Sequence, residues 1–185
     1  MPNPPKIMMI RHAEKPESPP PFGVKEDGTQ SPHALIALGW QRAGALIAFF
    51  AAPVVAAIAA PHALYASAVA SGSPPEPSSV DDFGKSLRPI ETITPLSRRL
   101  GLTPDQTYAV GDEDSLAASV ALKDGVVLIA WEHKHIPLIA KHFTQASPDE
   151  WPEDRFDVVW VLDRAADGTY GFVQVPQMLL STDVP

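Results

Sequence analysis

Two histidines follow directly after short apolar runs and could act on one substrate. Residues 7–10 form a continuous apolar run that leads into Arg11 and His12, and residues 126–131 form a second run that leads towards His133. Such runs are typical of buried parallel strands, and open α/β sheets bind ligands outside the carboxyl ends of their strands. If the two strands are neighbours, we expect both histidines at one edge of the sheet.

Arginines beside a histidine are suited to phosphate chemistry. Arg88 stands just before a predicted helix over 89–100 and is the candidate second arginine. A guanidinium group can bind two phosphate oxygens at once, and a neutral imidazole such as that of His12 can attack phosphorus and carry the phosphoryl group. A protonated His133 would add another donor. The expected phosphate site therefore consists of two arginines and two histidines: Arg11, His12, Arg88 and His133.

The order of the predicted elements indicates an α/β fold. Apolar runs, turn residues and helical periodicity predict strands at 7–10, 63–67, 126–131, 157–162 and 170–175, and helices at 34–50, 89–100, 114–123 and 137–143. Long loops are predicted at 16–32 and 71–82. We expect a three-layer α/β/α sandwich with a mainly parallel sheet and a C-terminal antiparallel hairpin. The length of 185 residues predicts one domain, 1–185.

Composition narrows the class of protein. Hydrophobic residues make up 45% of the chain and charged residues 19%, as in a globular protein. The net charge of -8 argues against nucleic acid as a partner, and the absence of cysteine excludes disulfides and thiolate chemistry.

The uncharged run 43–60 is rich in alanine and is broken by Pro53, so no membrane association is expected from it. No signal peptide is apparent at the N-terminus, which favours a cytoplasmic location.

Several motifs are similar to those of one family. Arg11-His12-Ala13-Glu14 resembles the Arg-His-Gly-Glu signature of the histidine phosphatase superfamily, the phosphoglycerate mutase-like proteins. The segments 38–43, 65–67 and 88–96 resemble, in the same order, the family's helix start and its Ser, Arg, Thr and Leu region, and 127–133 resembles the strand that delivers its second histidine. The likeness covers residues 6 to 143. It departs from the family pattern at Ala13, Ile36 and Glu132.

The resemblance implies a fold and a reaction. It implies a phosphoglycerate mutase-like fold and the hydrolysis of phosphate monoesters through a phosphohistidine on His12, with no metal and no other cofactor. The expected substrate is a phosphorylated small molecule or a phosphoprotein, with phosphate or sulfate able to occupy the pocket. Two alternatives stay open: a phosphoglycerate-type mutase, and a non-catalytic phosphate-binding module of the same fold.

A general acid must protonate the leaving oxygen. In one branch of the family this acid is a glutamate between the second arginine and the second histidine, which favours Glu113, with Asp112 close behind it. Glu132 is a further candidate. If a strand carries both Glu132 and His133, however, their side chains should point to opposite faces of the sheet.

A metal site is the remaining alternative. His133, His135 and His142, together with Glu132, suggest zinc ligands, but their spacing matches no established ligand pattern.

Overall fold

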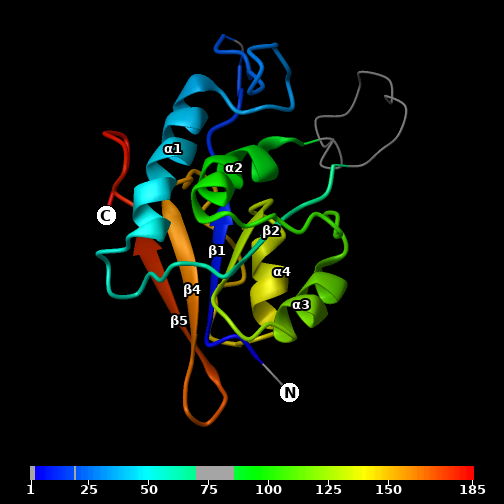
Figure 1. Cartoon of the computed structure of the whole chain (residues 1–185), viewed down its shortest axis with the longest axis vertical. Helices are drawn as coiled ribbons and strands as arrows, with labels where there is room; N and C mark the ends of the chain where they lie inside the picture. Colours follow the sequence, from blue (N-terminus) through cyan, green and yellow to red (C-terminus); the bar gives the residue numbers. More distant parts are fainter. Residues whose placement is uncertain (1–2, 19, 70–85) are drawn as a thin grey trace.

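The computed structural model describes residues 3–18, 20–69 and 86–185. Its five-stranded sheet has the order β2-β3-β1-β4-β5 (Figure 1). The strands are β1 (Lys6–Arg11), β2 (Ala63–Ala66), β3 (Val127–Trp131), β4 (Val158–Arg164) and β5 (Tyr170–Pro176). The helices are α1 (Ala37–Ala51), α2 (Arg88–Leu100), α3 (Glu113–Ala121) and α4 (Ile136–Lys141).

The parallel part of the sheet brings the two proposed histidine strands together. β1 lies beside β3 in parallel, with Arg11 opposite Trp131, and β2 extends the parallel group on the other side of β3. β4 pairs with β1 in the antiparallel direction, and β5 completes the hairpin. The carboxyl ends of β1 and β3 are therefore level, as we expected from the sequence.

Helices cover both faces of this sheet. Along β1, Met8 and Ile10 pack into a core with α1 and α2, whereas Ile7 and Met9 pack into a second core with α3 and α4. This alternation follows from the period of two in a strand. The prediction of an α/β fold with a parallel core and a C-terminal antiparallel hairpin is confirmed.

Local chemistry explains where two helices begin and end. Pro89 stands in the first turn of α2, where a missing N–H costs nothing, and Gly101 ends the helix with a left-handed φ of 67°. The predicted helix 34–50 begins three residues late, at Ala37. The two residues before the helix are bonded to other segments: the Leu35 amide donates to Glu91 Oε2 at 2.8 Å and the Ile36 amide donates to the Glu14 carbonyl at 3.1 Å.

The end of β3 matters for the site, and it lies at the residue predicted from the sequence. β3 ends at Trp131, so Glu132 and His133 lie in the turn that leads to α4. The alternation expected for residues on one strand therefore does not apply to these two side chains. The predicted loop 16–32 lacks helices and strands in its described residues apart from one bridge between Val24 and Gln30. The predicted loop 71–82 lies outside the described residues.

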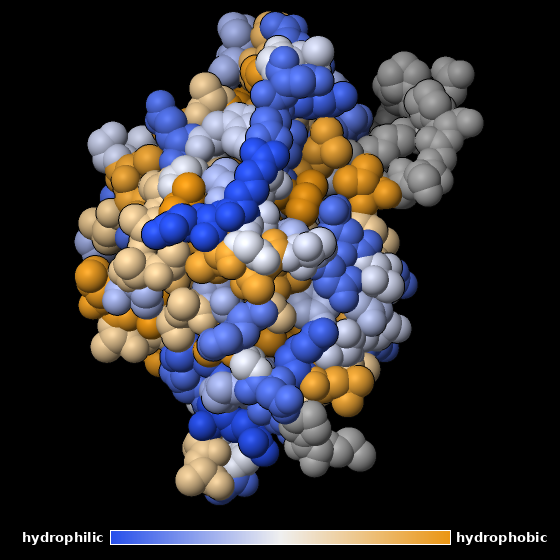
Figure 2. All heavy atoms as spheres, viewed as in Figure 1, coloured by the Kyte–Doolittle hydropathy of each residue, from blue (hydrophilic) through white to orange (hydrophobic). Residues whose placement is uncertain are grey.

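Polar and apolar residues are mixed on the face of the molecule that Figure 2 shows. Figure 2 shows apolar atoms gathered over α1 and the segment that follows it, where Val54 is 97% exposed. Among the helices that the structure describes, none is long and apolar enough to cross a membrane.

Candidate active site

His12 lies at the carboxyl edge of the sheet, one residue beyond β1. Its backbone amide donates to the Trp131 carbonyl at 3.1 Å, which extends the pairing with β3. The next amide, that of Ala13, donates to Thr92 Oγ1 on α2 at 2.8 Å. The backbone on both sides of the His12 side chain is thus fixed by two separate elements.

The imidazole of His12 is held in a defined tautomer. Nδ1 lies 2.8 Å from the Ala13 carbonyl, which can only accept a hydrogen bond, so Nδ1 carries the proton and Nε2 keeps its lone pair. Burial lowers the pKa of His12 well below 6.5, and the positive charges of Arg88, Arg11 and Lys15 lower it further. A neutral, buried imidazole with a free lone pair is the form that can act as a nucleophile.

Arg11 is buried beside His12 with one donor unused. Its guanidinium carbon lies 3.8 Å from the centre of the Phe156 ring, and Nη1 donates to the Glu153 carbonyl. Arg11 Nε is buried and has no hydrogen-bond partner among the described residues. Burial lowers the pKa of Arg11 to about 10, and Glu132 is the carboxylate that opposes this most. A buried donor without a partner is costly unless an anion accepts from it.

Arg88 and Lys15 add two further cations. Arg88 Nη2 donates to the Pro32 carbonyl at 2.7 Å, while Arg88 Nε is buried without a partner in the described part of the chain. Burial, together with the charges of Arg11 and Arg88, lowers the pKa of Lys15. Mutual repulsion among these cations indicates a site built to receive negative charge.

Glu132 and His133 form a pair at the end of β3. His133 Nδ1 lies 2.6 Å from Glu132 Oε1, and both residues are at most 8% exposed. Burial raises the pKa of Glu132, but its hydrogen bond to His133 and the charge of that histidine outweigh burial, so the pKa is lowered overall. The Lys134 amide also donates to Glu132 Oε2 at 2.8 Å, which fixes the carboxylate in the turn.

Glu113 has a different set of partners. The buried carboxylate accepts hydrogen bonds from Trp131 Nε1 at 3.0 Å and from the Gly111 amide, and it lies 2.9 Å from His135 Nδ1. None of its contacts in the described residues joins it to Arg11, His12 or Arg88. Asp112 is exposed and accepts from the Ala109 amide. The structure thus brings Arg11, His12 and Arg88 together, with Glu132 and His133 beside Arg11, and gives Glu113 an anchoring role.

A buried ion network supports the segment that follows His12. Glu14 accepts from Arg42 Nε and Nη2 at 3.0 and 2.7 Å, and Arg42, which is 2% exposed, also donates to both carboxylate oxygens of Asp183. α1 can approach this segment because Gly39 has no side chain: an added Cβ would lie 2.6 Å from the Glu14 carbonyl oxygen.

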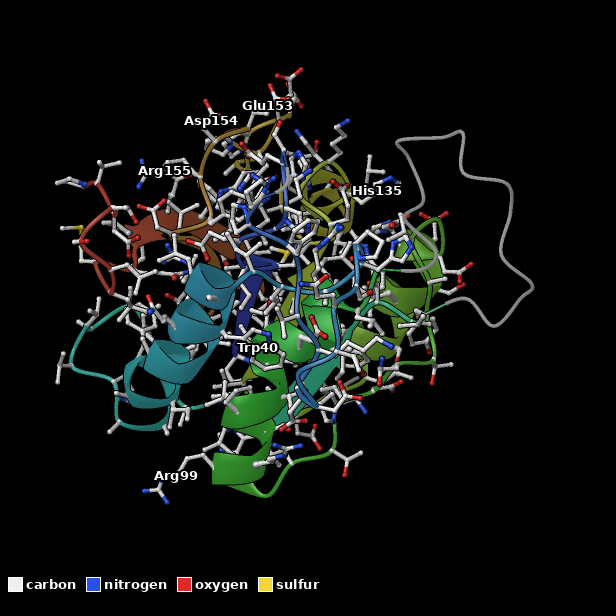
Figure 3. All side chains as sticks on the ribbon, turned by 90° about the horizontal axis from the view of Figure 1, so that it is seen from above. Trp40, Arg99, His135, Glu153, Asp154 and Arg155 are labelled. Carbon is white, nitrogen blue, oxygen red and sulfur yellow. The ribbon has the colours of Figure 1, made fainter. Side chains whose placement is uncertain are left out.

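Three contributors to the site were not assigned these roles from the sequence: Lys15, Thr92 and Phe156. Lys15 offered a signal, since it follows His12 by three residues in a loop at a strand end. The contact between Phe156 and Arg11 joins residues far apart in the chain, and no local pattern indicates it. Figure 3 looks onto this edge of the sheet and shows Glu153, Asp154 and Arg155 on the loop before β4.

The histidines considered as zinc ligands each face a different carboxylate. His133 pairs with Glu132, His135 with Glu113, and His142 Nε2 with Asp114 at 3.0 Å. Within the described residues, no three histidine, aspartate or glutamate side chains gather in a way that could hold a metal ion.

No protein-family model matches the chain, and no curated protein matches it.

Proposed function

We propose that the protein is a phosphatase that hydrolyses phosphate monoesters through a phosphohistidine on His12. One observation carries this proposal: a neutral His12 with its Nε2 lone pair available lies among the cations Arg11, Arg88 and Lys15. Nearby, Arg11 Nε and Arg88 Nε are buried without partners in the described residues. These donors match the charge that spreads over the oxygens of a transferring phosphoryl group. The phosphoglycerate mutase-like fold is part of the same proposal.

The reaction proceeds in two displacements. His12 Nε2 forms a bond to phosphorus as the bond to the ester oxygen breaks, and the arginines hold the equatorial oxygens. Water then attacks phosphorus, the P–N bond breaks, and inorganic phosphate leaves. The Nδ1–H bond to the Ala13 carbonyl keeps the ring oriented in both steps.

The Glu132–His133 pair supplies the proton for the leaving oxygen. His133 Nδ1 and Glu132 Oε1 lie 2.6 Å apart, and in this proposal a proton carried by the pair passes to the leaving oxygen in the first step. Water returns a proton to the pair in the second step. Glu113, favoured from the sequence, is the alternative donor, but its carboxylate is occupied by Trp131 and Gly111.

Hydrolysis of 4-nitrophenyl phosphate in the presence of a chelator tests the proposal. We expect turnover by the wild type and a loss of at least about 10³-fold in the His12→Ala variant, because no other described residue replaces the nucleophile. His142→Ala is the matched control, since this histidine lies on the surface and pairs with Asp114. Acid-labile phosphate on the wild type alone would identify the intermediate. Near-normal turnover by His12→Ala would refute the mechanism.

A phosphate-binding module without turnover is the second candidate. The absence of any described contact between Glu113 and His12 favours it, because a site without a proton donor can hold an anion but releases an alcohol slowly. Tight binding of inorganic phosphate together with no turnover of any ester would support this candidate.

A further inference from the structure

A cavity of about 350 Å³ adjoins the proposed phosphoryl site. It is lined by His133 and Lys134 from the turn after β3, and by Asp149, Glu150, Trp151 and Glu153 from the loop before β4. Figure 3 shows this loop at the same edge of the sheet as His135. The volume is at the small end of the range for ligand pockets, and is suited to a group of a few heavy atoms.

The cavity and the phosphoryl site share their walls. His133 belongs to both, and Arg11 donates to the carbonyl of Glu153 while its guanidinium packs on Phe156 of the same loop. A monoester whose phosphorus faces His12 therefore has this cavity as the neighbouring space for its leaving group.

The aromatic wall of the cavity is fixed before any ligand binds. Trp151 is 5% exposed, its Nε1 donates to the Arg155 carbonyl at 2.9 Å, and its ring packs 5.0 Å from that of Trp160. Asp149 also pairs with Lys141 of α4 at 2.7 Å, but its side chain is 91% exposed and this pair adds little rigidity. A preformed aromatic wall lowers the entropic cost of binding.

The charges of the cavity oppose those around the phosphate. Glu150 and Glu153 have no ion-pair partner in the described residues, and Lys134 is the one ammonium group among the lining side chains. Glu153 and Asp154 are also among the carboxylates that raise the pKa of Arg11 against the effect of burial. Carboxylates beside an aromatic ring are the chemistry that recognises an ammonium group.

We infer that this cavity receives a positively charged leaving group, so that the preferred substrates are small phosphate monoesters that carry an ammonium group. The inference rests on the proposed phosphatase activity. The phosphate end binds to the arginines and Lys15, and the ammonium end lies against Trp151, Glu150 and Glu153.

Three esters of similar size test the charge preference of the cavity. The group esterified to the phosphate is cationic in 2-aminoethyl phosphate, uncharged in propyl phosphate and anionic in phosphoglycolate. We expect kcat/KM for the ammonium ester to exceed that for propyl phosphate by about fivefold to tenfold, and phosphoglycolate to be the poorest substrate. Glu150→Gln combined with Glu153→Gln should bring the ammonium-to-propyl ratio towards one. Asp124→Asn, which removes a carboxylate just before β3 at the opposite edge of the sheet, should leave the ratio unchanged.

Binding separates this inference from the phosphatase proposal. Calorimetric titration of the His12→Asn variant with the same esters should give the same order of Kd, whether or not the wild type turns them over. If no ester is hydrolysed, the phosphatase proposal fails while the Kd ratio still decides the role of the cavity. Equal Kd values for the ammonium and propyl esters, or tighter binding of phosphoglycolate, would overturn the inference.

Discussion

Thr92 joins the nucleophile segment to the helix that carries Arg88. Its hydroxyl accepts from the Ala13 amide at 2.8 Å and donates to the Arg88 carbonyl at 2.7 Å, and the residue is fully buried. One side chain thereby fixes the backbone next to His12 relative to the first turn of α2. The distance between the proposed nucleophile and the second arginine depends on this link.

We predict that Thr92→Val lowers both stability and turnover. The buried Ala13 amide loses its acceptor, which costs about 1–3 kcal/mol of unfolding free energy, and a shift of His12 relative to Arg88 should lower kcat by about tenfold or more. Urea unfolding and aryl phosphate hydrolysis measure the two effects.

Two variants are the controls. Thr92→Ser keeps the hydroxyl and should retain most of the turnover. Thr94→Val removes a hydroxyl whose one hydrogen bond among the described residues is to the Ile90 carbonyl of the same helix, and normal turnover there is the control.

The buried pair of Arg42 and Asp183 should be essential for stability. Asp183→Ala leaves part of a buried guanidinium without its carboxylate and removes the acceptor for the Leu179 and Leu180 amides. We expect a loss of about 3 kcal/mol in urea unfolding.

The matched control for Asp183 is Glu26→Ala, which breaks another arginine–carboxylate pair. Arg98 and Glu26 are 64% and 54% exposed, so solvent screens their attraction and no measurable loss is expected. Equal losses in the two variants would show that the buried network has no special role.

Short-range patterns predicted most of the fold. The apolar runs at β1 and β3, the proline that begins α2 and the glycine that ends it are local signals, and the structure places these elements within a few residues of the prediction. The position of β4 beside β1 was not predicted. It depends on antiparallel pairing between Lys6 and Asp163, residues far apart in the chain, which no local pattern encodes.

Site residues at the end of a strand could be placed from the sequence, because the position of the strand in the sheet fixes their position. Arg11 ends β1 and His12 follows it, so the parallel pairing of β1 with β3 brings both to the edge near His133. The role proposed for Glu132 depends on where β3 ends, because side chains alternate between faces only inside a strand and Glu132 lies just past the end of β3. Strand alternation could therefore not decide between Glu113 and Glu132.

The leaving-group dependence of turnover distinguishes the two candidate proton donors. A variant that lacks the donor should hydrolyse 4-nitrophenyl phosphate, whose leaving group needs little protonation, much better than an alkyl phosphate. We predict that Glu132→Gln lowers kcat for an alkyl phosphate by about 10²-fold or more and for the aryl ester by far less. Glu113→Gln should lower both equally through the loss of its Trp131 contact. The reverse pattern would restore Glu113 as the acid.

The buried His12 should also make the folded protein sensitive to acid. Its pKa in the folded state lies well below 6.5, chiefly because burial disfavours the charged ring. As pH falls below about 6.5, the unfolded chain takes up a proton at this residue and the folded chain does not, so the free energy of unfolding falls until the folded pKa is reached. His12→Gln removes this one contribution. Urea unfolding should therefore show that the stability of the variant relative to the wild type rises as the pH is lowered from 7.5 to 5. His142→Gln, at an exposed histidine, controls for the loss of a surface imidazole. If the difference between wild type and His12→Gln is the same at both pH values, His12 is not held neutral, and the form of the nucleophile proposed above is wrong.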